Sequence, residues 1–156
     1  MRAHVPTRSL RADSAPIGVT PSPVRLSLPA QARNIAVVRR ALEAIAEELA
    51  LPRRLIEDMR LAVTEACTNV VRHAYSEGEA RDANAMRVEL LPGTDGMRVI
   101  VEDRGRGLGH SLDASGLGLG LPLIAALTSQ LQVSPGADGR GSRIAMSFAP
   151  TPIEAA

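Results

Sequence analysis

Hydrophobic residues recur along this chain with two different periods, and the changes between them predict alternating strands and helices. Apolar and polar residues alternate over residues 24–28, which predicts a short strand with one solvated face, ended by Pro29. Apolar positions then follow the helical period over residues 30–50 and again from Pro52 to about residue 74. The first half of the chain is therefore predicted to form a strand followed by two helices.

Two further strands are predicted to form a hairpin. Alternation over residues 86–90 and 97–103 flanks a segment of turn composition at residues 92–96. In the second strand the alternation places Asp103 on the same face as the inward-facing Val101. A carboxylate is thus directed toward the core at the end of a strand. This is costly unless hydrogen-bond donors reach it.

Beyond the hairpin the chain returns to helix and strand patterns. Alternate glycines within residues 116–120 precede an apolar helix expected at about residues 121–131. A strand is expected near residues 131–134, and a last strand with an alternating inward face at residues 142–148. These elements predict an α/β two-layer sandwich, in which three helices cover one face of a mixed, mostly antiparallel sheet.

The chain is expected to form one domain. Its 156 residues suffice for a sizeable core, which must be mainly aliphatic because the sequence has one Phe, one Tyr and no Trp. Residues 1–23 mix Arg, Ser, Pro and Thr without a period and are expected to be a disordered leader. The domain is expected at residues 24–149, with a flexible tail at residues 150–156.

Composition excludes several classes of function. The formal net charge of +1 gives no basic footprint for nucleic acid. The sequence has no Lys, so a P-loop is excluded. The single cysteine, Cys67, excludes a disulfide framework and is expected to be a small buried residue. Without an apolar run near ~18 residues or a signal peptide, no membrane association is expected, and the expected compartment is the cytoplasm.

A polar stripe follows the second predicted helix. Glu65, Asn69 and His73 stand at steps of four, so at about 100° per residue they lie within roughly 80° of one another. The stripe adjoins the apolar face that should pack on the core. A carboxylate followed by an uncharged amide at that margin suits a metal or a ligand. An incidental surface stripe explains the pattern equally well when it is taken alone.

Two glycine-containing segments are further candidates for ligand binding. Gly105 and Gly107 follow Asp103, where glycines let the backbone pass close to a planar ligand or simply make a turn. The glycines of residues 116–120 leave backbone N–H groups free to point at phosphate at a helix start, or make a close-packed hinge. A Rossmann motif is excluded because no strand immediately precedes these glycines and no βαβ repeat follows.

Four features stand in a fixed order, and the ordered set resembles the GHKL ATPase superfamily, which includes gyrase, chaperone, mismatch-repair and histidine-kinase ATP-binding domains. These features are Glu65-x-x-x-Asn69, Asp103-x-Gly105-x-Gly107, Gly116-x-Gly118 and Gly141-Ser142. The compact size, the segment Thr64-Glu65-Ala66-Cys67-Thr68-Asn69 and the segment His73-Ala74-Tyr75 are most similar to anti-sigma serine/threonine protein kinases of the RsbW and SpoIIAB type. The resemblance covers about residues 24–148 and implies a Bergerat-type ATP-binding fold.

The resemblance implies ATP and Mg²⁺ as cofactors. It makes Glu65 the general base, Asn69 the Mg²⁺ ligand and Asp103 the acceptor for the adenine amino group. The chemistry of the side chains agrees, since an amide oxygen suits a hard cation and a carboxylate one turn away can accept a proton. The residues implied to bind the nucleotide are Asn69, His73, Asp103, Gly105, Gly107, Gly116, Leu117, Gly118, Leu119 and Ser142.

Two departures from the family pattern are visible. The segment between Gly107 and Gly116, where the family carries its ATP lid, is short. Without Lys, the cation for the phosphates must be an arginine, and Arg72, Arg104 and Arg106 are equal candidates. For His73 the sequence favours a structural hydrogen bond to a neighbouring loop over a phosphate contact.

The function implied by the resemblance is that of an anti-sigma factor with serine/threonine kinase activity. Such a protein phosphorylates an antagonist of STAS type, sequesters a sigma factor and forms a homodimer. A non-catalytic nucleotide-binding interaction module is one alternative. A histidine-kinase-type ATPase domain is the other, but the chain lacks room for the dimerisation helices that carry the phosphoacceptor histidine.

Overall fold

The computed structural model describes residues 19–75, 85–107 and 120–150. The elements in these ranges are β1 (Val24–Pro29), α1 (Ala32–Glu48), α2 (Arg53–Asn69), the π-helical turn η1 (Val70–Ala74), β2 (Ala85–Pro92), β3 (Met97–Asp103), α3 (Gly120–Leu127), β4 (Gln130–Pro135) and β5 (Ser142–Phe148). None of the helices in these ranges combines the length and the apolar character that crossing a bilayer requires.

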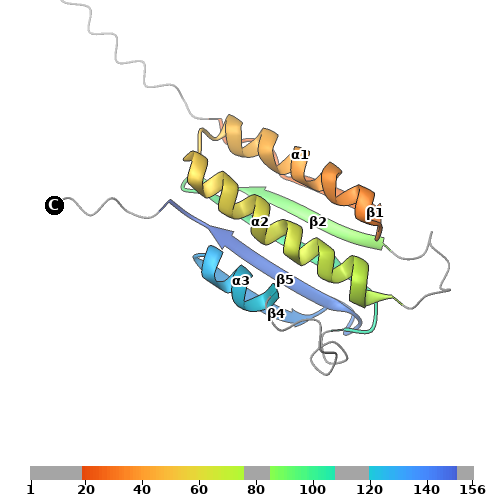
Figure 1. Ribbon diagram of the computed structural model, residues 1–156. Coiled ribbons are helices and arrows are strands. Elements are labelled where there is room, and N and C mark those ends of the chain that lie inside the picture. Colours follow the sequence, from red (N-terminus) through yellow and green to blue (C-terminus); the bar gives the residue numbers. More distant parts are fainter. Residues whose placement is uncertain (1–18, 76–84, 108–119, 151–156) are drawn as a thin grey trace, which may run out of the picture.

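The predicted two-layer α/β architecture is confirmed. The strands form one sheet in the order β1-β2-β3-β5-β4, and α1, α2 and α3 all lie on the same side of it (Figure 1). The sheet was expected to be mixed and mostly antiparallel, and each of its four described pairings is antiparallel. The predicted hairpin is the β2–β3 pair, in which Val88 stands opposite Val101.

The core lies between the sheet and the helices. Alternate residues of the three central strands are buried on the helix side, as the period of two predicted. Leu42 of α1 and Met59 of α2 are buried on the helix side of the same core. The largest fully buried side chains are Leu42, Met59, Met86, Leu90, Ile124, Ile144 and Met146. Because these residues are aliphatic or thioether side chains, the core forms without Trp and with a single Phe.

The helix-free face of the sheet is mostly polar, but it also carries Leu91, Ile100 and Ala145. Ile100 of β3 and its neighbour Ala145 of β5 stand on this face, yet both are buried. Long polar side chains surround the pair, and Arg98 donates to Gln132 at 3.1 Å across the face. Stems of such side chains cover apolar surface while their polar ends stay in water. The expected solvated face is therefore interrupted at its centre.

The apolar helix after the glycine-rich segment is shorter than predicted. It ends at Leu127 rather than near residue 131, and β4 begins at Gln130. The Thr128 hydroxyl donates to the Ile124 carbonyl oxygen at 3.0 Å, and both the backbone N–H and the hydroxyl of Ser129 donate to the Ser147 carbonyl oxygen at 2.8 Å. These bonds direct the chain into the sheet, a tertiary constraint that local periodicity does not contain.

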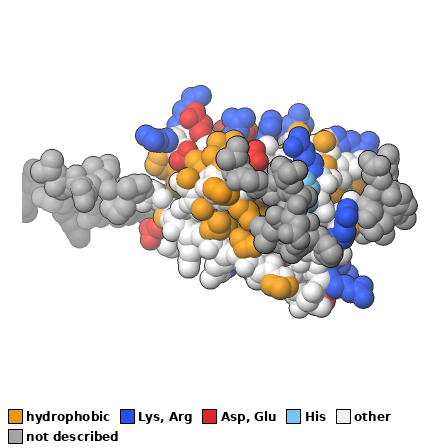
Figure 2. Space-filling model, turned by 60° about the horizontal axis from the view of Figure 1, so that its bottom comes forward, with side chains coloured by type: hydrophobic (Ala, Val, Ile, Leu, Met, Phe, Trp, Pro, Cys, Tyr) orange, Lys and Arg blue, Asp and Glu red, His pale blue; other side chains and the backbone are white. Residues whose placement is uncertain are grey.

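α3 is apolar over most of its surface. Ile124 is buried against the core, whereas Pro122, Ala125 and Ala126 are exposed. Hydrophobic side chains accordingly gather on the face that Figure 2 turns forward, where α3 lies, with arginines toward the rim of the molecule. α3 therefore contributes apolar surface both to the core and to the exterior.

The β2–β3 turn predicts a difference between its two glycines. Gly96 has φ +151°, and a Cβ there would overlap the Phe148 carbonyl oxygen, so we expect Gly96→Ala to destabilise the fold by about 1–3 kcal/mol. Gly93→Ala is the matched control, because its Cβ would meet the nearest atom at an ordinary 3.5 Å. Urea unfolding of both variants measures the difference. Equal stabilities would contradict the steric argument.

Candidate functional site

The structure brings Glu65 and Asn69 together with the first residue of α3. α2 packs on the core through Met59, Ala62, Val63, Ala66 and Cys67, and this leaves the two predicted site residues half-buried at the margin of that face. A Cβ on Gly120 would lie 3.4 Å from both amide atoms of Asn69 and 3.8 Å from Oε2 of Glu65. The carboxylate and the amide therefore converge on one spot beneath the start of α3.

The Asn69 amide is left incomplete by the described residues. Its Nδ2 is buried and has no hydrogen-bond partner, and among the described residues no other buried side-chain nitrogen or oxygen is in this state. Leaving a buried donor unpaired costs about 1–3 kcal/mol, so such groups usually mark a place where another molecule or segment completes the bonding. The missing side chain of Gly120 leaves room above it.

The polar stripe ends at Asn69. The helix was expected to continue to about residue 74 in α-form, but α2 ends at Asn69 and the next turn, η1, is π-helical. His73 therefore no longer follows Asn69 at the α-helical step. The described residues provide no hydrogen bond to its imidazole, and residues 76–84, which follow η1 closely, lie outside them. The structural role of His73 stays a prediction.

Asp103 lies where alternation predicted, and its two oxygens have protein donors. The carboxylate is 4% exposed. The hydroxyl of Ser142 donates to Oδ2 at 2.5 Å, and the backbone N–H of Gly105 donates to Oδ1 at 2.8 Å. The donors that the sequence required for this carboxylate therefore come from the protein itself, and its role as acceptor for the adenine amino group stays a prediction. Carboxylate oxygens can each accept more than one hydrogen bond, so room for a further donor remains.

Close backbone contacts explain two of the glycines near Asp103. A Cβ on Gly105 would overlap the carbonyl oxygen of Ala74 at the end of η1. Gly141, with φ +68°, passes so near the Asp103 carbonyl oxygen that a side chain there would collide with it. Glycine is therefore required at both positions for the loop after β3 to fit between η1 and the start of β5.

A cavity of about 520 Å³ opens beside this loop. Its walls are residues 105–107 on one side and parts of the β4–β5 hairpin on the other, including Val133, Arg140 and Gly141. Arg106 also lines it, so two arginines and four glycines are among the residues around this space.

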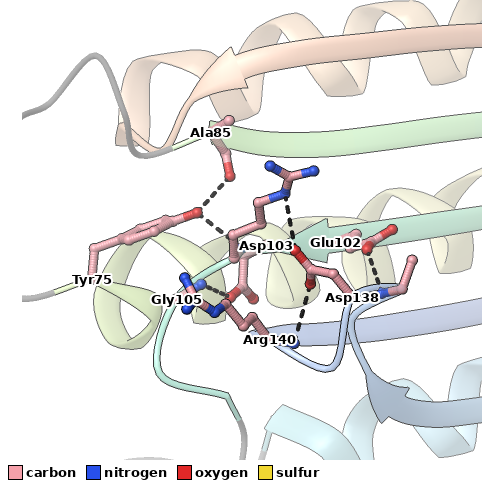
Figure 3. A network of polar contacts seen from close by, with 9 residues as sticks. Tyr75, Ala85, Glu102, Asp103, Gly105, Asp138 and Arg140 are labelled. Carbon is pink, nitrogen blue, oxygen red and sulfur yellow. Dashed lines mark hydrogen bonds and ion pairs between the residues drawn. The ribbon is translucent and has the colours of Figure 1, made fainter.

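The three candidate phosphate-binding arginines have different surroundings. Arg104 is engaged elsewhere, because its Nε lies 3.8 Å from Oδ2 of Asp138 (Figure 3). Arg106 lines the cavity, and Arg72 is exposed on η1. The backbone N–H of Arg140, followed by the charges of Arg104 and Arg140, keeps the pKa of Asp138 below its usual range, so this exposed carboxylate is ionised near neutral pH.

Two other properties limit the chemistry available at this site. Burial raises the pKa of the Cys67 thiol to about 12, so Cys67 is a neutral packing residue, as predicted, and not a nucleophile. Within the described ranges no group of three or more His, Cys, Asp or Glu side chains could hold a metal ion. An ion bound there would need ligand oxygens in addition to those of the protein, which is the usual situation for Mg²⁺ at phosphates.

Comparison with known proteins decides the family. Residues 28–148 match the histidine kinase-like ATPase domain. This chain belongs to that ATPase domain family. A serine-protein kinase RsbW of Bacillus licheniformis is 30% identical over 122 residues, covering 70% of this chain and 76% of the relative. The RsbW of Bacillus pumilus is 32% identical over 126 residues with the same coverage.

A solved structure shows the same fold. The crystal structure of the RsbU and RsbW domains of Rv1364c from Mycobacterium tuberculosis has a TM-score of 0.63 at 22% sequence identity. The match covers 84% of this chain but only 34% of that longer chain. The resemblance to the ATPase domain family inferred from the ordered motifs is therefore confirmed, and so is the fold.

The structure adds three residues to the candidate site, Gly120, Tyr75 and Arg140, to which the sequence gave no role of their own. In the sequence Gly120 is one of several glycines ahead of a helix, whereas in the structure it is the glycine that faces Asn69. Tyr75 belongs to the segment that carried the resemblance but was given no role. Arg140 gave no signal, because its position opposite Arg106 depends on the β4–β5 hairpin. Gly116, Leu117, Gly118 and Leu119 lie outside the described residues.

The hydrogen bond from Ser142 to the Asp103 carboxylate can be tested by mutation. We expect Ser142→Ala to lower the free energy of unfolding by about 1–3 kcal/mol, because a buried carboxylate loses a donor. Ser147→Ala is the control, a serine on the same strand whose hydroxyl makes no such bond to a buried carboxylate. Chemical denaturation at pH 7 measures both. A control as unstable as Ser142→Ala would contradict this role for the hydroxyl.

Proposed function

We propose that this chain binds ATP with Mg²⁺ and transfers the γ-phosphoryl group to a serine or threonine of a protein antagonist, acting as an anti-sigma factor. The observation that carries the proposal is the convergence of Glu65, the unpaired Asn69 amide and Gly120 at one spot. Relatives named serine-protein kinase RsbW, about 30% identical over most of their length, support the same activity.

The residues present fit a nucleotide with its metal ion. Asn69 would hold Mg²⁺ through its amide oxygen, and its buried Nδ2 would gain an acceptor from a phosphate oxygen. When bound, Mg²⁺ would neutralise charge on the phosphates. Asp103 would accept a hydrogen bond from the adenine amino group with capacity not used by Ser142 and Gly105. The nucleotide would thus be held at two ends.

In the proposed reaction Glu65 is the general base. The hydroxyl oxygen of the acceptor side chain forms a bond to the γ-phosphorus as the bond from that phosphorus to the leaving ADP oxygen breaks. Glu65 takes the hydroxyl proton. Its half-buried carboxylate stands beside Asn69, which places the base next to the proposed phosphate end. Arg106, which lines the cavity, is our candidate for the cation missing because the chain has no Lys.

The partners belong to the same proposal. A STAS-type antagonist would supply the acceptor hydroxyl, and a sigma factor would be the sequestered protein, which requires a cytoplasmic location. We also propose a homodimer. The deciding experiment is capture of partners from the native cell by the tagged full chain with and without ATP, followed by a phosphosite search. Capture of a sigma factor without phosphorylation of any captured protein would favour a non-catalytic interaction module instead.

Asn69 can be tested by metal-dependent binding. We expect Asn69→Ala to weaken ATP binding in Mg²⁺ on the order of 10- to 100-fold, because a charge-assisted contact is lost. Titration calorimetry in Mg²⁺ and in EDTA distinguishes the Asn69 end of the nucleotide site from the Asp103 end. In Asn69→Ala only the increase in ATP affinity that Mg²⁺ causes should disappear. Asn34→Ala is the control, as it removes an amide at the start of α1 that bonds Pro29 instead. An unchanged Mg²⁺-dependent gain in Asn69→Ala would exclude the role.

Glu65 can be tested by separating binding from transfer. We expect Glu65→Gln to keep ATP affinity within about twofold and to slow phosphotransfer to the captured antagonist by roughly 10²-fold or more, because the base is lost. Glu57→Gln is the matched control, an exposed glutamate on the same helix. Transfer would be followed with radiolabelled ATP. Equal rates for the two variants would remove Glu65 from the mechanism.

A further inference from the structure

One hydroxyl group joins three segments of the chain beside the site. The Tyr75 hydroxyl donates to the carbonyl oxygen of Ala85, the first residue of β2, at 2.7 Å. It also accepts from the backbone N–H of Arg104, the residue after β3, at 3.1 Å. Figure 3 shows the ring of Tyr75 reaching from the end of η1 to these two partners. The hydroxyl uses both its donor and its acceptor capacity in this contact.

A second contact joins two of these segments, the end of η1 and the loop after β3. The backbone N–H of Arg106 donates to the carbonyl oxygen of Ala74, the last residue of η1, at 2.8 Å. The chain can approach this closely because Gly105 has no side chain to collide with the same oxygen. The end of η1 and the loop after β3 are thus connected twice, once through a side chain and once through the backbone.

These contacts lie between the two ends of the proposed nucleotide site. Asn69 immediately precedes η1, and Asp103 immediately precedes Arg104. The path from the amide to the carboxylate therefore runs through the single turn η1 and across the Tyr75–Arg104 and Ala74–Arg106 bonds. π-Helical turns are rare and frequently occur at functional sites. Here η1 carries the Ala74 carbonyl oxygen onto the loop.

We propose that Tyr75 is a positioning residue that fixes the separation between the Asn69 end and the Asp103 end of the nucleotide site. The inference rests on the proposed function, since it assigns the two ends to one ligand. Tyr75 acts through the loop and does not touch the reacting atoms. The donors to Asp103 are Ser142 and Gly105, and the Tyr75 hydroxyl is not one of them. A ligand that uses only the base end should therefore be insensitive to Tyr75.

The test compares a ligand that spans both ends with one that reaches only the base end. In the full chain, Tyr75→Phe should weaken binding of ATP with Mg²⁺ roughly 3- to 10-fold, the loss expected for a net hydrogen bond. Adenosine affinity should stay within about twofold of the wild type. NMR titration measures both ligands on one protein, including weak adenosine binding. Ser129→Ala is the control, because it removes a hydroxyl bonded at 2.8 Å to the Ser147 carbonyl oxygen, outside the site.

The outcomes separate the two proposals. Wild-type protein that binds no ATP would overturn the proposed function and this inference with it. If the wild type binds ATP, equal affinity in Tyr75→Phe, or the same loss for ATP and adenosine, would overturn the positioning role alone. A loss confined to ATP with Mg²⁺ supports it, because a general loss of stability affects both ligands.

A measurement without mutation covers the case in which Tyr75→Phe does not fold. In the wild type, hydrogen exchange at the backbone amides of Arg104 and Arg106 reports opening of the two contacts. ATP with Mg²⁺ should slow both amides by at least about threefold more than saturating adenosine does, because only a ligand held at both ends resists their separation. Equal protection by the two ligands would overturn the inference.

Discussion

The buried carboxylate of Asp103 is the constraint on which the site depends. A polar group removed from water is tolerated only with compensating hydrogen bonds. Here the compensation comes from two places that are distant in sequence, a hydroxyl on β5 and a backbone N–H of the following loop. The carboxylate thereby fixes the end of β3 relative to β5 and shapes the loop at Gly105. This end of the site is complete once the chain has folded.

The Asn69 end is in the opposite state. Its amide is buried beneath Gly120 with an unpaired nitrogen, so folding of the described residues leaves it incomplete. The Asp103 end is therefore organised before a ligand binds. At the Asn69 end, the buried amide nitrogen has lost its water without gaining a partner, and a ligand can supply that partner. Under the proposed function, recognition of the base would precede full engagement of the phosphates and the metal. Preorganisation at one end lowers the ordering cost of binding, and the unpaired amide favours a ligand with many acceptor oxygens.

The features predicted correctly were those that follow from the spacing of apolar and polar residues within one strand or helix. Alternation placed Asp103 on the buried face of β3, and the helical step brought Glu65 and Asn69 to one side of α2. The errors arose from contacts between distant segments. α3 ends early because Ser129 bonds β5, and Ile100 is buried on the polar face by side chains from neighbouring strands. No local pattern carries that information.

The connection between the two ends shows why sequence reasoning had so little to detect there. Three of the four groups in the Tyr75–Arg104 and Ala74–Arg106 bonds belong to the backbone, which every non-proline residue supplies. Only Tyr75, which provides the hydroxyl, and Gly105, which permits the approach, depend on residue identity. A rigid coupling between helix and loop is thus encoded at two positions. Gly105 was a candidate for nucleotide binding from the sequence, but its contact with Ala74, and the contact of Tyr75 with Arg104, follow only from the course of the chain after η1.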